Sequence, residues 1–419
     1  MGSSLTQKIL ITLGFLFAYR VLAYIPVPGV DLDVIKQFFE SNQNNALGLA
    51  NMFSGNALQR LSIISLGIMP YITASIVMEL LAATFPSLGQ MKKERDGMQK
   101  YMQIIRYATI FITIIQAIGV AFGLQQLGAN GQNPILIDMT SFVIITVFSM
   151  LTGTMLLMWF GEQITQRGIG NGISLIIFAG IVSGIPSAIA HTISQVNAGT
   201  MSFATVLAIF AIMIVTVLVI IYVELGERRI PISYSRKTLI KNQHKKIMNY
   251  IPIRLNISGV IPPIFASAIL MFPLTVLKAS TNPIIMQITD LLSPGGWLYN
   301  VLMFVLVIFF AFFYASIQFN AKDIAENLKR QGGFIPGVRP GEQTVKFLTD
   351  VASKLTLWGA LYLAIISTVP FIIINSLGAS FYFGGTAVLI VVQVALDTMR
   401  KIEAQRVMGQ YETMGNMGL

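Results

Sequence analysis

The stretch that decides the fold is residues 51–85, NMFSGNALQRLSIISLGIMPYITASIVMELLAATF. It begins polar, carries Arg60 on a short amphipathic piece, passes Pro70, and becomes a predominantly apolar helix only over residues 71–84. About 14 residues are fewer than the roughly 20 that a membrane-crossing helix needs. Irregular backbone within a bilayer must be buried in protein or line water. The stretch therefore predicts a half-helix with a broken start, beside an aqueous path.

Composition places the rest of the chain in a membrane as well. Of its 419 residues, 54% are hydrophobic and only 11% are charged, so most of the surface must face hydrocarbon. The absence of cysteine excludes disulfides, thiol chemistry and cysteine-ligated metal. The first apolar run lacks a small-residue cleavage site and many more runs follow it, which predicts an uncleaved first span.

Apolar runs of helical length predict ten spans. They lie near residues 9–27, 70–85, 104–124, 140–160, 173–190, 203–223, 258–277, 300–318, 354–375 and 383–399. Lysines and arginines concentrate in the connections after the second, fourth, sixth and eighth spans. Because short basic loops stay on the cytoplasmic side, both chain termini are predicted to be cytoplasmic.

The ten spans divide into an N-terminal half (residues 1–195) and a C-terminal half (residues 196–419). An odd number of crossings in each half places the two halves in opposite orientation, which implies an inverted repeat with the functional path at its interface. The predicted fold class is thus all-α. It is a polytopic membrane protein of ten transmembrane helices in two inverted five-helix halves, with a broken second helix.

Two predicted cytoplasmic loops, residues 224–254 and 320–352, are longer than a helix connection requires. In the first, apolar residues occupy alternate positions from Ile230 to Tyr234, which predicts a strand or a hairpin. In the second, closely spaced Pro and Gly predict a turn with Arg339 at its tip. Contact with anionic lipids is one interpretation of such basic loops. The ordered turn favours the other, a docking surface for a large acidic partner such as rRNA or a protein.

Sequence motifs for catalysis, metal binding or nucleotide hydrolysis are absent. The two histidines, His191 and His244, lie outside the predicted spans and suit neither a zinc site nor a Ser-His dyad. A secondary transporter for a small solute would need paired charge at mid-membrane, and Glu79 is the only deep candidate. An intramembrane hydrolase is the third alternative, but the spans hold no His, Cys or paired Asp. We therefore predict no enzyme, no metal site and no cofactor.

What the spans offer instead is isoleucine at breaks and mid-span positions. Six positions stand out: Ile68, Ile72, Ile173, Ile177, Ile264 and Ile390. Isoleucine is ordinarily a lipid-facing or core residue, and that interpretation holds for most isoleucines in this chain. These six form a site only if their four helices converge on one axis.

Five motifs carry a resemblance to a known family. They are IMPYITASI (68–76), GEQITQRGIGNGIS (161–174), GVIPPIFAS (259–267), GGFIPGVRPG (332–341) and GGTAVLIVV (384–392). Together they resemble the SecY family of protein-translocation channels, and its bacterial branch most closely. The resemblance covers all ten spans and both long loops.

The resemblance implies a clam-shell of two five-helix halves around a pore that conducts unfolded polypeptides and releases apolar segments sideways into lipid. The implied pore ring is Ile68, Ile72, Ile173, Ile177, Ile264 and Ile390. The implied plug is residues 53–66 with Phe53, Gly55 and Arg60, and the implied lateral gate, between spans two and seven, carries Glu79, Asn171 and Ser267. The implied docking residues are Arg228, Arg229, Arg236, Lys237 and Arg339.

The implied protein is the central pore-forming subunit of the general protein-secretion translocon in the bacterial cytoplasmic (inner) membrane. Its implied partners are the SecE and SecG subunits, the SecA motor ATPase, the ribosome through its protein and rRNA, signal sequences, unfolded preproteins and anionic lipids. Three features depart from the family pattern. The first span begins after about eight residues, so we expect a cytoplasmic N-terminal helix to be missing. Residues 241–246 (KNQHKK) replace a Gly-rich hairpin tip, and Glu79 stands where relatives carry an amide.

Overall fold

Long apolar helices make up the structure, a computed structural model that describes residues 5–41, 51, 54–128, 134–234, 249–277, 291–292, 296–376 and 385–416. The N-terminal helices are α1 (Leu5–Leu22), α2 (Leu32–Ser41), the 3-10 helix η1 (Leu58–Arg60), α4 (Met69–Thr84), α5 (Pro86–Lys93), α6 (Arg95–Gly128), α7 (Met139–Arg167) and α8 (Gly172–Asn197). The C-terminal helices are α9 (Phe203–Leu225), α10 (Ile261–Leu277), α12 (Trp297–Gln318), α13 (Ala321–Arg330), α14 (Glu342–Ser376) and α15 (Gly385–Asn416).

Each of the ten predicted spans falls on one of these helices. By length and apolar composition, 7 described helices can cross a membrane, and 8 if α4 and α5 together form one span bent by 115°. The described apolar part of α10 is short, and the second half of α15 is polar. The structure therefore confirms a polytopic helical membrane protein, while the number ten stays a prediction.

The first span was predicted to reach residue 27, but α1 ends at Leu22. Pro26 and Pro28 follow, and the residue before a proline avoids the helical conformation. The chain instead turns there and forms an isolated bridge between Pro26 and Ser62.

The broken start of the second span is irregular. In the short amphipathic piece that carries Arg60, the only helical element is the single 3-10 turn of η1. The backbone bonds elsewhere: Val27 N–H donates to the Leu61 carbonyl (2.8 Å), and Ile63 N–H donates to the Ile25 carbonyl (3.0 Å). Since buried backbone groups must find partners, these bonds replace the helical ones. Leu61 takes the left-handed conformation (φ 38°), which only a well-packed site tolerates.

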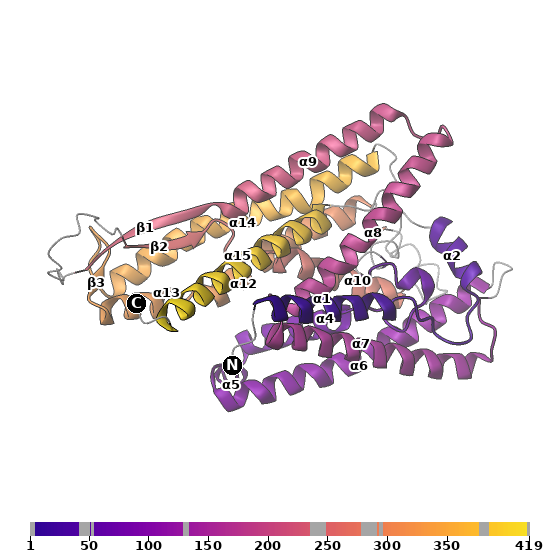
Figure 1. The fold of residues 1–419 in the computed structure, drawn as a ribbon, viewed down its shortest axis with the longest axis horizontal. Helices are drawn as coiled ribbons and strands as arrows, with labels where there is room; N and C mark the ends of the chain where they lie inside the picture. The colour runs from indigo at the N-terminus through magenta and orange to yellow at the C-terminus, as the bar shows by residue number, and fades with distance from the viewer. Residues whose placement is uncertain are drawn as a thin grey trace.

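The helices pack in two groups (Figure 1). Helices α1 and α4 to α8 pack on one another, as do α9, α10, α12, α14 and α15. The groups meet where α10 packs against α4 and α6, and where α15 packs against α8 and α1. The chain passes from one group to the other through residues 198–202, between α8 and α9.

A small sheet lies at one end of the bundle (Figure 1). β1 (Glu227–Tyr234) pairs antiparallel with β2 (Asn249–Arg254), which confirms the predicted strand or hairpin. The short β3 (Gly333–Phe334), from the second long loop, adds to the other edge of β1, which was not predicted. Ile230 and Ile253 of the hairpin are buried with Leu328 and Leu348 of α13 and α14. The two long loops are therefore one folded unit.

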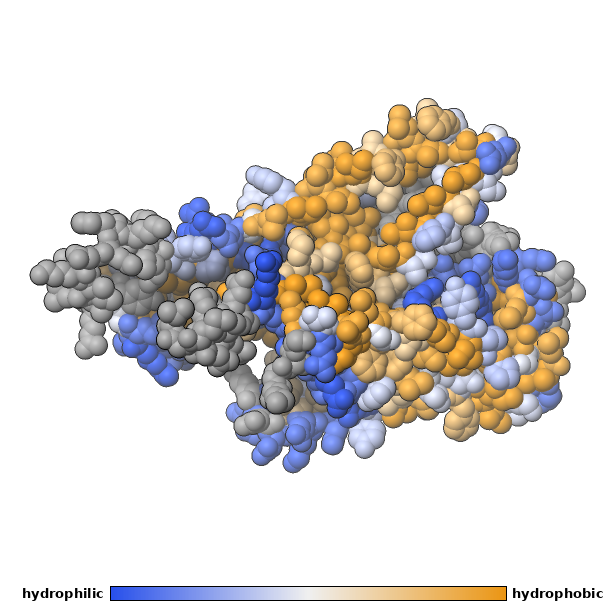
Figure 2. Space-filling view, in the orientation of Figure 1, coloured by the Kyte–Doolittle hydropathy of each residue, from blue (hydrophilic) through white to orange (hydrophobic). Residues whose placement is uncertain are grey.

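The surface agrees with a lipid environment. Figure 2 shows broad hydrophobic areas over the helices and hydrophilic residues toward the end that carries the sheet. On helix α9, for example, the large side chains of Phe203, Leu207, Phe210 and Tyr222 are exposed. Exposed apolar area of this extent fits contact with hydrocarbon.

The packing of the irregular segment yields a stability prediction. A Cβ on Gly153 of α7 would collide with the main-chain oxygen of Ile63, whereas a Cβ on Gly123 of α6 meets nothing within 4 Å. We expect Gly153→Ala to lower the thermal unfolding midpoint of the purified protein in detergent. Gly123→Ala, the matched control, should keep or raise it, because alanine favours a helix over glycine by about 1 kcal/mol. Equal midpoints for the two variants would contradict this packing.

Candidate functional site

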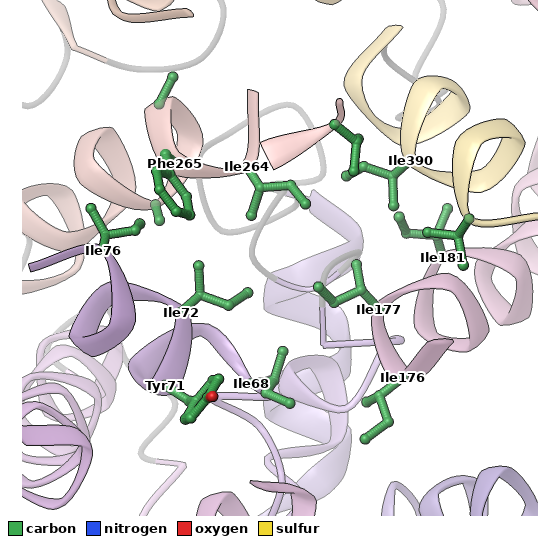
Figure 3. Packing of buried hydrophobic residues seen from close by; sticks show 14 of the residues in the cluster. Ile68, Tyr71, Ile72, Ile76, Ile176, Ile177, Ile181, Ile264, Phe265 and Ile390 are labelled. Carbon is green, nitrogen blue, oxygen red and sulfur yellow. The ribbon is translucent and has the colours of Figure 1, made fainter. Parts of the chain in front are cut away.

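Five of the six selected isoleucines lie together in one buried cluster, although they come from four helices. They are Ile68 at the start of α4, Ile72 on α4, Ile177 on α8, Ile264 on α10 and Ile390 on α15. Figure 3 shows these side chains directed toward a shared space. The most exposed of them, Ile264, is only 8% accessible. We call this set the isoleucine cluster.

The sixth isoleucine, Ile173, is placed differently. It is half-buried, packs at the edge of the cluster, and lies against Gly161 of α7. It also lines an open pocket of about 620 Å³, together with Arg106 and Glu162. The structure therefore does not bring Ile173 into the shared space with the other five.

Two further isoleucines accompany the cluster and were not selected from the sequence. Ile76 and Ile181, one helical turn after Ile72 and Ile177, are buried in the same core (Figure 3). Spacing of four residues places side chains on one helix face. That spacing was the available signal for both residues.

Close helix contacts bring the cluster together. A Cβ on Gly172 would collide with the Gly161 carbonyl, so α7 and α8 approach at bare backbone. A Cβ on Gly385 would collide with the Ile366 carbonyl, which brings α15 equally close to α14. Pro70 sits in the first turn of α4, where it loses no hydrogen bond. These close contacts and the helix start near Pro70 set the positions of Ile72, Ile177 and Ile390 relative to one another.

Residues 54–66, which we call the plug segment, are held by α1. Arg20 Nη1 donates to the Gly55 carbonyl at 2.9 Å, and Tyr19 Oη donates to the Ser54 carbonyl at 3.2 Å. Gly55 has φ +70°, and a Cβ there would meet Tyr19 Oη at 2.5 Å, so glycine is required. The guanidinium of Arg60 lies over the Tyr24 ring at 4.0 Å. Phe53 lies outside the described residues.

The three predicted gate residues have separate surroundings. The buried Ser267 Oγ donates to the Ile264 carbonyl of its own helix at 2.8 Å. Asn171 caps α8 by accepting from Ile173 N–H at 3.2 Å. Glu79 pairs with Lys92 at 3.3 Å. None of the hydrogen bonds found in the described residues joins two of the three, although Glu79 and Ser267 lie on helices α4 and α10, which pack together.

The predicted docking residues lie on the sheet unit. Arg228 is exposed, and Arg229 Nε donates to Glu227 Oε1 at 2.6 Å, which raises the pKa of Arg229. Arg339 is exposed on the predicted turn, whose Gly337 and Gly341 have left-handed φ values of 84° and 106°. Thr344 Oγ1 donates to the carbonyl of Arg339 at 2.9 Å. Arg236, Lys237 and the loop tip 241–246 lie outside the described residues.

Across the residues with described positions, no three His, Cys, Asp or Glu side chains lie close enough to hold an ion. The chemical character of the isoleucine cluster is instead uniformly apolar. It offers shape and exclusion of water rather than ligands.

These features define a class: a polytopic helical membrane protein with a broken helix beside a buried isoleucine cluster. Residues 62–399 match the SecY family model, and the chain belongs to the SecY family. It is 67% identical over 419 residues to the protein translocase subunit SecY of Helicobacter pylori (strain ATCC 700392 / 26695), covering 100% of both chains.

Solved structures share the fold. One concerns the plug domain of a SecY protein and the closed state of the translocation channel (TM-score 0.69, 19% identity, 97% of this chain and 94% of that chain). Another is Sec61 in the canine ribosome-channel complex from the endoplasmic reticulum (TM-score 0.65, 18% identity, 96% of this chain and 93% of that chain).

The bonds from Tyr19 and Arg20 to the plug segment, which we call the clamp, can be tested by labelling, because the chain has no native cysteine. Ser65 is 2% exposed, so a Ser65→Cys variant should react slowly with a water-soluble maleimide. Adding Arg20→Gln removes the bond to Gly55 and should raise the labelling rate at least about tenfold, since a bond from a charged donor contributes roughly 1.5–3 kcal/mol. Lys36→Gln on α2, which is exposed, is the control and should leave the rate unchanged. An equal rate with and without Arg20 would contradict the clamp.

Proposed function

We propose that this chain is the central pore-forming subunit of the general protein-secretion translocon. It conducts unfolded polypeptides across the bacterial cytoplasmic (inner) membrane and releases apolar segments sideways into lipid. The observation that carries the proposal is the convergence of five isoleucines from four helices on one shared space. Nothing in their local sequence requires convergence, since each would be equally stable facing lipid. Membership of the SecY family supports the same function.

The isoleucine cluster is the proposed pore ring, with Ile173 at its edge. An apolar constriction blocks ions by dewetting. Branched aliphatic side chains make no specific hydrogen bonds, so they can fit around a passing chain of any sequence. The ring therefore closes the resting pore and tolerates many substrates.

The plug segment is the proposed second barrier. Its buried Leu61 and Ile64 are both 0% exposed, and Ile64 belongs to the same core as the ring. The clamp by Tyr19 and Arg20 favours this closed position. A passing chain must displace the segment, and the bonds of the clamp set part of the work required.

Sideways release requires the two helix groups to separate. We propose that residues 1–195 and 196–419 are the two halves, with the lateral gate where α10 packs against α4. An apolar segment of the substrate gains roughly 0.8 kcal/mol for each buried CH2 when it moves from water into lipid. The partitioning of the segment therefore needs no energy from the channel.

We infer that movement of the substrate chain through the pore is driven by a partner, since the sequence carries no recognisable motif for nucleotide hydrolysis. We propose that the sheet unit docks the ribosome or the SecA motor on the cytoplasmic side, where both termini also lie. The related fold of Sec61, solved in a ribosome-channel complex, supports the ribosome as a partner. SecE, SecG and anionic lipids are the further proposed partners at the lipid-facing surface.

The proposed pore ring can be tested by replacing its apolar side chains with polar ones. Replacing Ile72 and Ile264 by Asn should raise the resting ion conductance in planar bilayers, because amide side chains hold water in the constriction. The same variant should export precursors with defective signal sequences, since less apolar contact is lost on opening. Ile176 points away from the shared space (Figure 3), so Ile176→Asn with Val391→Asn is the matched control and should do far less. A conductance increase of equal size in the control would contradict the proposed pore ring.

Docking is tested at Arg339. Arg339→Glu should stop motor-driven export in reconstituted vesicles while the thermal unfolding midpoint stays unchanged, because an exposed loop charge contributes little to stability. Lys36→Glu, an equal charge change on the exposed face of α2, should export normally. Normal export by the Arg339 variant would show that the motor docks elsewhere.

A further inference from the structure

Glu79 is a predicted lateral-gate residue, but neither the proposed pore ring nor the proposed gate uses its carboxylate. Its Oε1 accepts from Lys92 Nζ at 3.3 Å, whereas its Oε2 is buried without a hydrogen-bond partner. Glu162 provides the contrast, because both of its oxygens accept from Arg106 Nη2, at 2.9 and 2.8 Å. Glu79 thus has one buried oxygen without a donor, whereas each oxygen of Glu162 has one.

The partner of Glu79 reaches it only through the bend between α4 and α5. On a straight helix, 13 residues of separation would place Lys92 about 20 Å away. Phe85 is extended (φ −104°, ψ 111°), Pro86 begins the next helix, and the two helices meet at 115°. The bend therefore returns the Lys92 ammonium to the carboxylate.

Glu79 and Tyr101 lie on either side of one ammonium group, that of Lys92. Lys92 Nζ also lies 5.9 Å from the centre of the Tyr101 ring, and Tyr101 is 3% exposed with an unpartnered hydroxyl. A carboxylate beside an aromatic face is a favourable arrangement for a cation. The side chains of Lys92 and Glu79 remain 35% and 22% exposed, so their ion pair contributes little and can be exchanged.

The site lies on the same helix face as the ring. Ile72, Ile76 and Glu79 follow the spacing i, i+4, i+7, which aligns side chains on one side of α4. Glu79 is about 10 Å along the helix axis from Ile72. A signal sequence has a basic n-region before an apolar h-region of about 7–15 residues, which as a helix spans roughly 10–22 Å. An h-region placed beside Ile72 and Ile76 would therefore bring its n-region to Glu79.

We propose that Glu79 and Tyr101 bind the basic n-region of an entering signal sequence, and that Lys92 occupies this site until the substrate cation replaces it. The inference rests on the proposed translocation function and names the substrate group that the gate selects. Glu79 then determines specificity, because precursors whose n-regions carry Lys or Arg bind to it and are exported faster. The exchange also frees α5 from α4, next to the helix that packs against α10.

The test compares export rates of one precursor with three n-region lysines and with three glutamines in their place. The full channel complex and its motor are reconstituted in vesicles of phosphatidylglycerol, whose headgroup carries no ammonium that could fill the site. In the Glu79→Gln variant, the ratio of the basic to the neutral rate should fall about two- to fivefold, as expected for a partly exposed charge pair. Lys92→Gln should raise the ratio, because it removes the internal competitor. Glu94→Gln, at an exposed carboxylate between α5 and α6, is the control and should not change it.

Charge reversal makes the test stricter. Glu79→Lys should favour a precursor with three n-region aspartates over the basic one. A merely structural Glu79 would slow all precursors alike, and that outcome, or an unchanged ratio in Glu79→Gln, overturns the inference. Failure of the unmodified channel to export any precursor would instead overturn the proposed function.

A labelling readout separates binding from export. Ala83, exposed one turn after Glu79, can be changed to Cys in this cysteine-free chain, with a second Cys in the n-region of an arrested precursor. We expect disulfide formation in Ala83→Cys and at least about a twofold lower yield when Glu79→Gln is added. An equal yield would show that the carboxylate does not hold the n-region.

Discussion

The structure depends on one constraint: backbone polar groups that leave a helix inside an apolar interior must find partners within the protein. The plug segment interrupts the second span, and its N–H and C=O groups bond to residues 25–27 and to the Arg20 and Tyr19 side chains. α1 and the residues that follow it therefore do more than cross the membrane, because they supply the partners that stabilise an irregular segment at this place. The same bonds confine the segment beside the isoleucine cluster.

Close helix contacts at glycines bring the members of the isoleucine cluster together. Bare backbone at Gly153, Gly172 and Gly385 lets the plug segment, α8 and α15 approach their neighbours closely. Larger residues at these positions would push the helices apart and separate Ile177 and Ile390 from Ile72. The proposed seal thus depends on glycines that lie outside it, and the isoleucines provide only the apolar side chains that occupy the shared space.

The sheet unit and the membrane helices are physically connected. Arg254 of β2 lies 3.6 Å from Asp397 of α15, and Arg400 Nη2 donates to the Glu224 carbonyl at the end of α9 at 3.0 Å. Glu224 itself is 4% exposed and accepts from Asn256, which precedes α10, at 2.7 Å. A partner that holds the sheet therefore holds, through few bonds, the two helices that carry Ile264 and Ile390.

The sequence by itself determined the membrane class, the ten candidate spans, the break before Pro70, the hairpin after α9 and the turn at Arg339. Each of these follows from local composition, period or turn chemistry, which act over a few residues. Only the tertiary structure decided that five isoleucines share one space while Ile173 lines a pocket, because their helices are far apart in sequence and any of them could face lipid. It also decided that β3 joins the hairpin and that Lys92 returns to Glu79, since both depend on chain reversals whose geometry no local pattern encodes. How the broken start of the second span is held was decided in the same way, because its backbone bonds to residues 25–27, which are far away in the sequence.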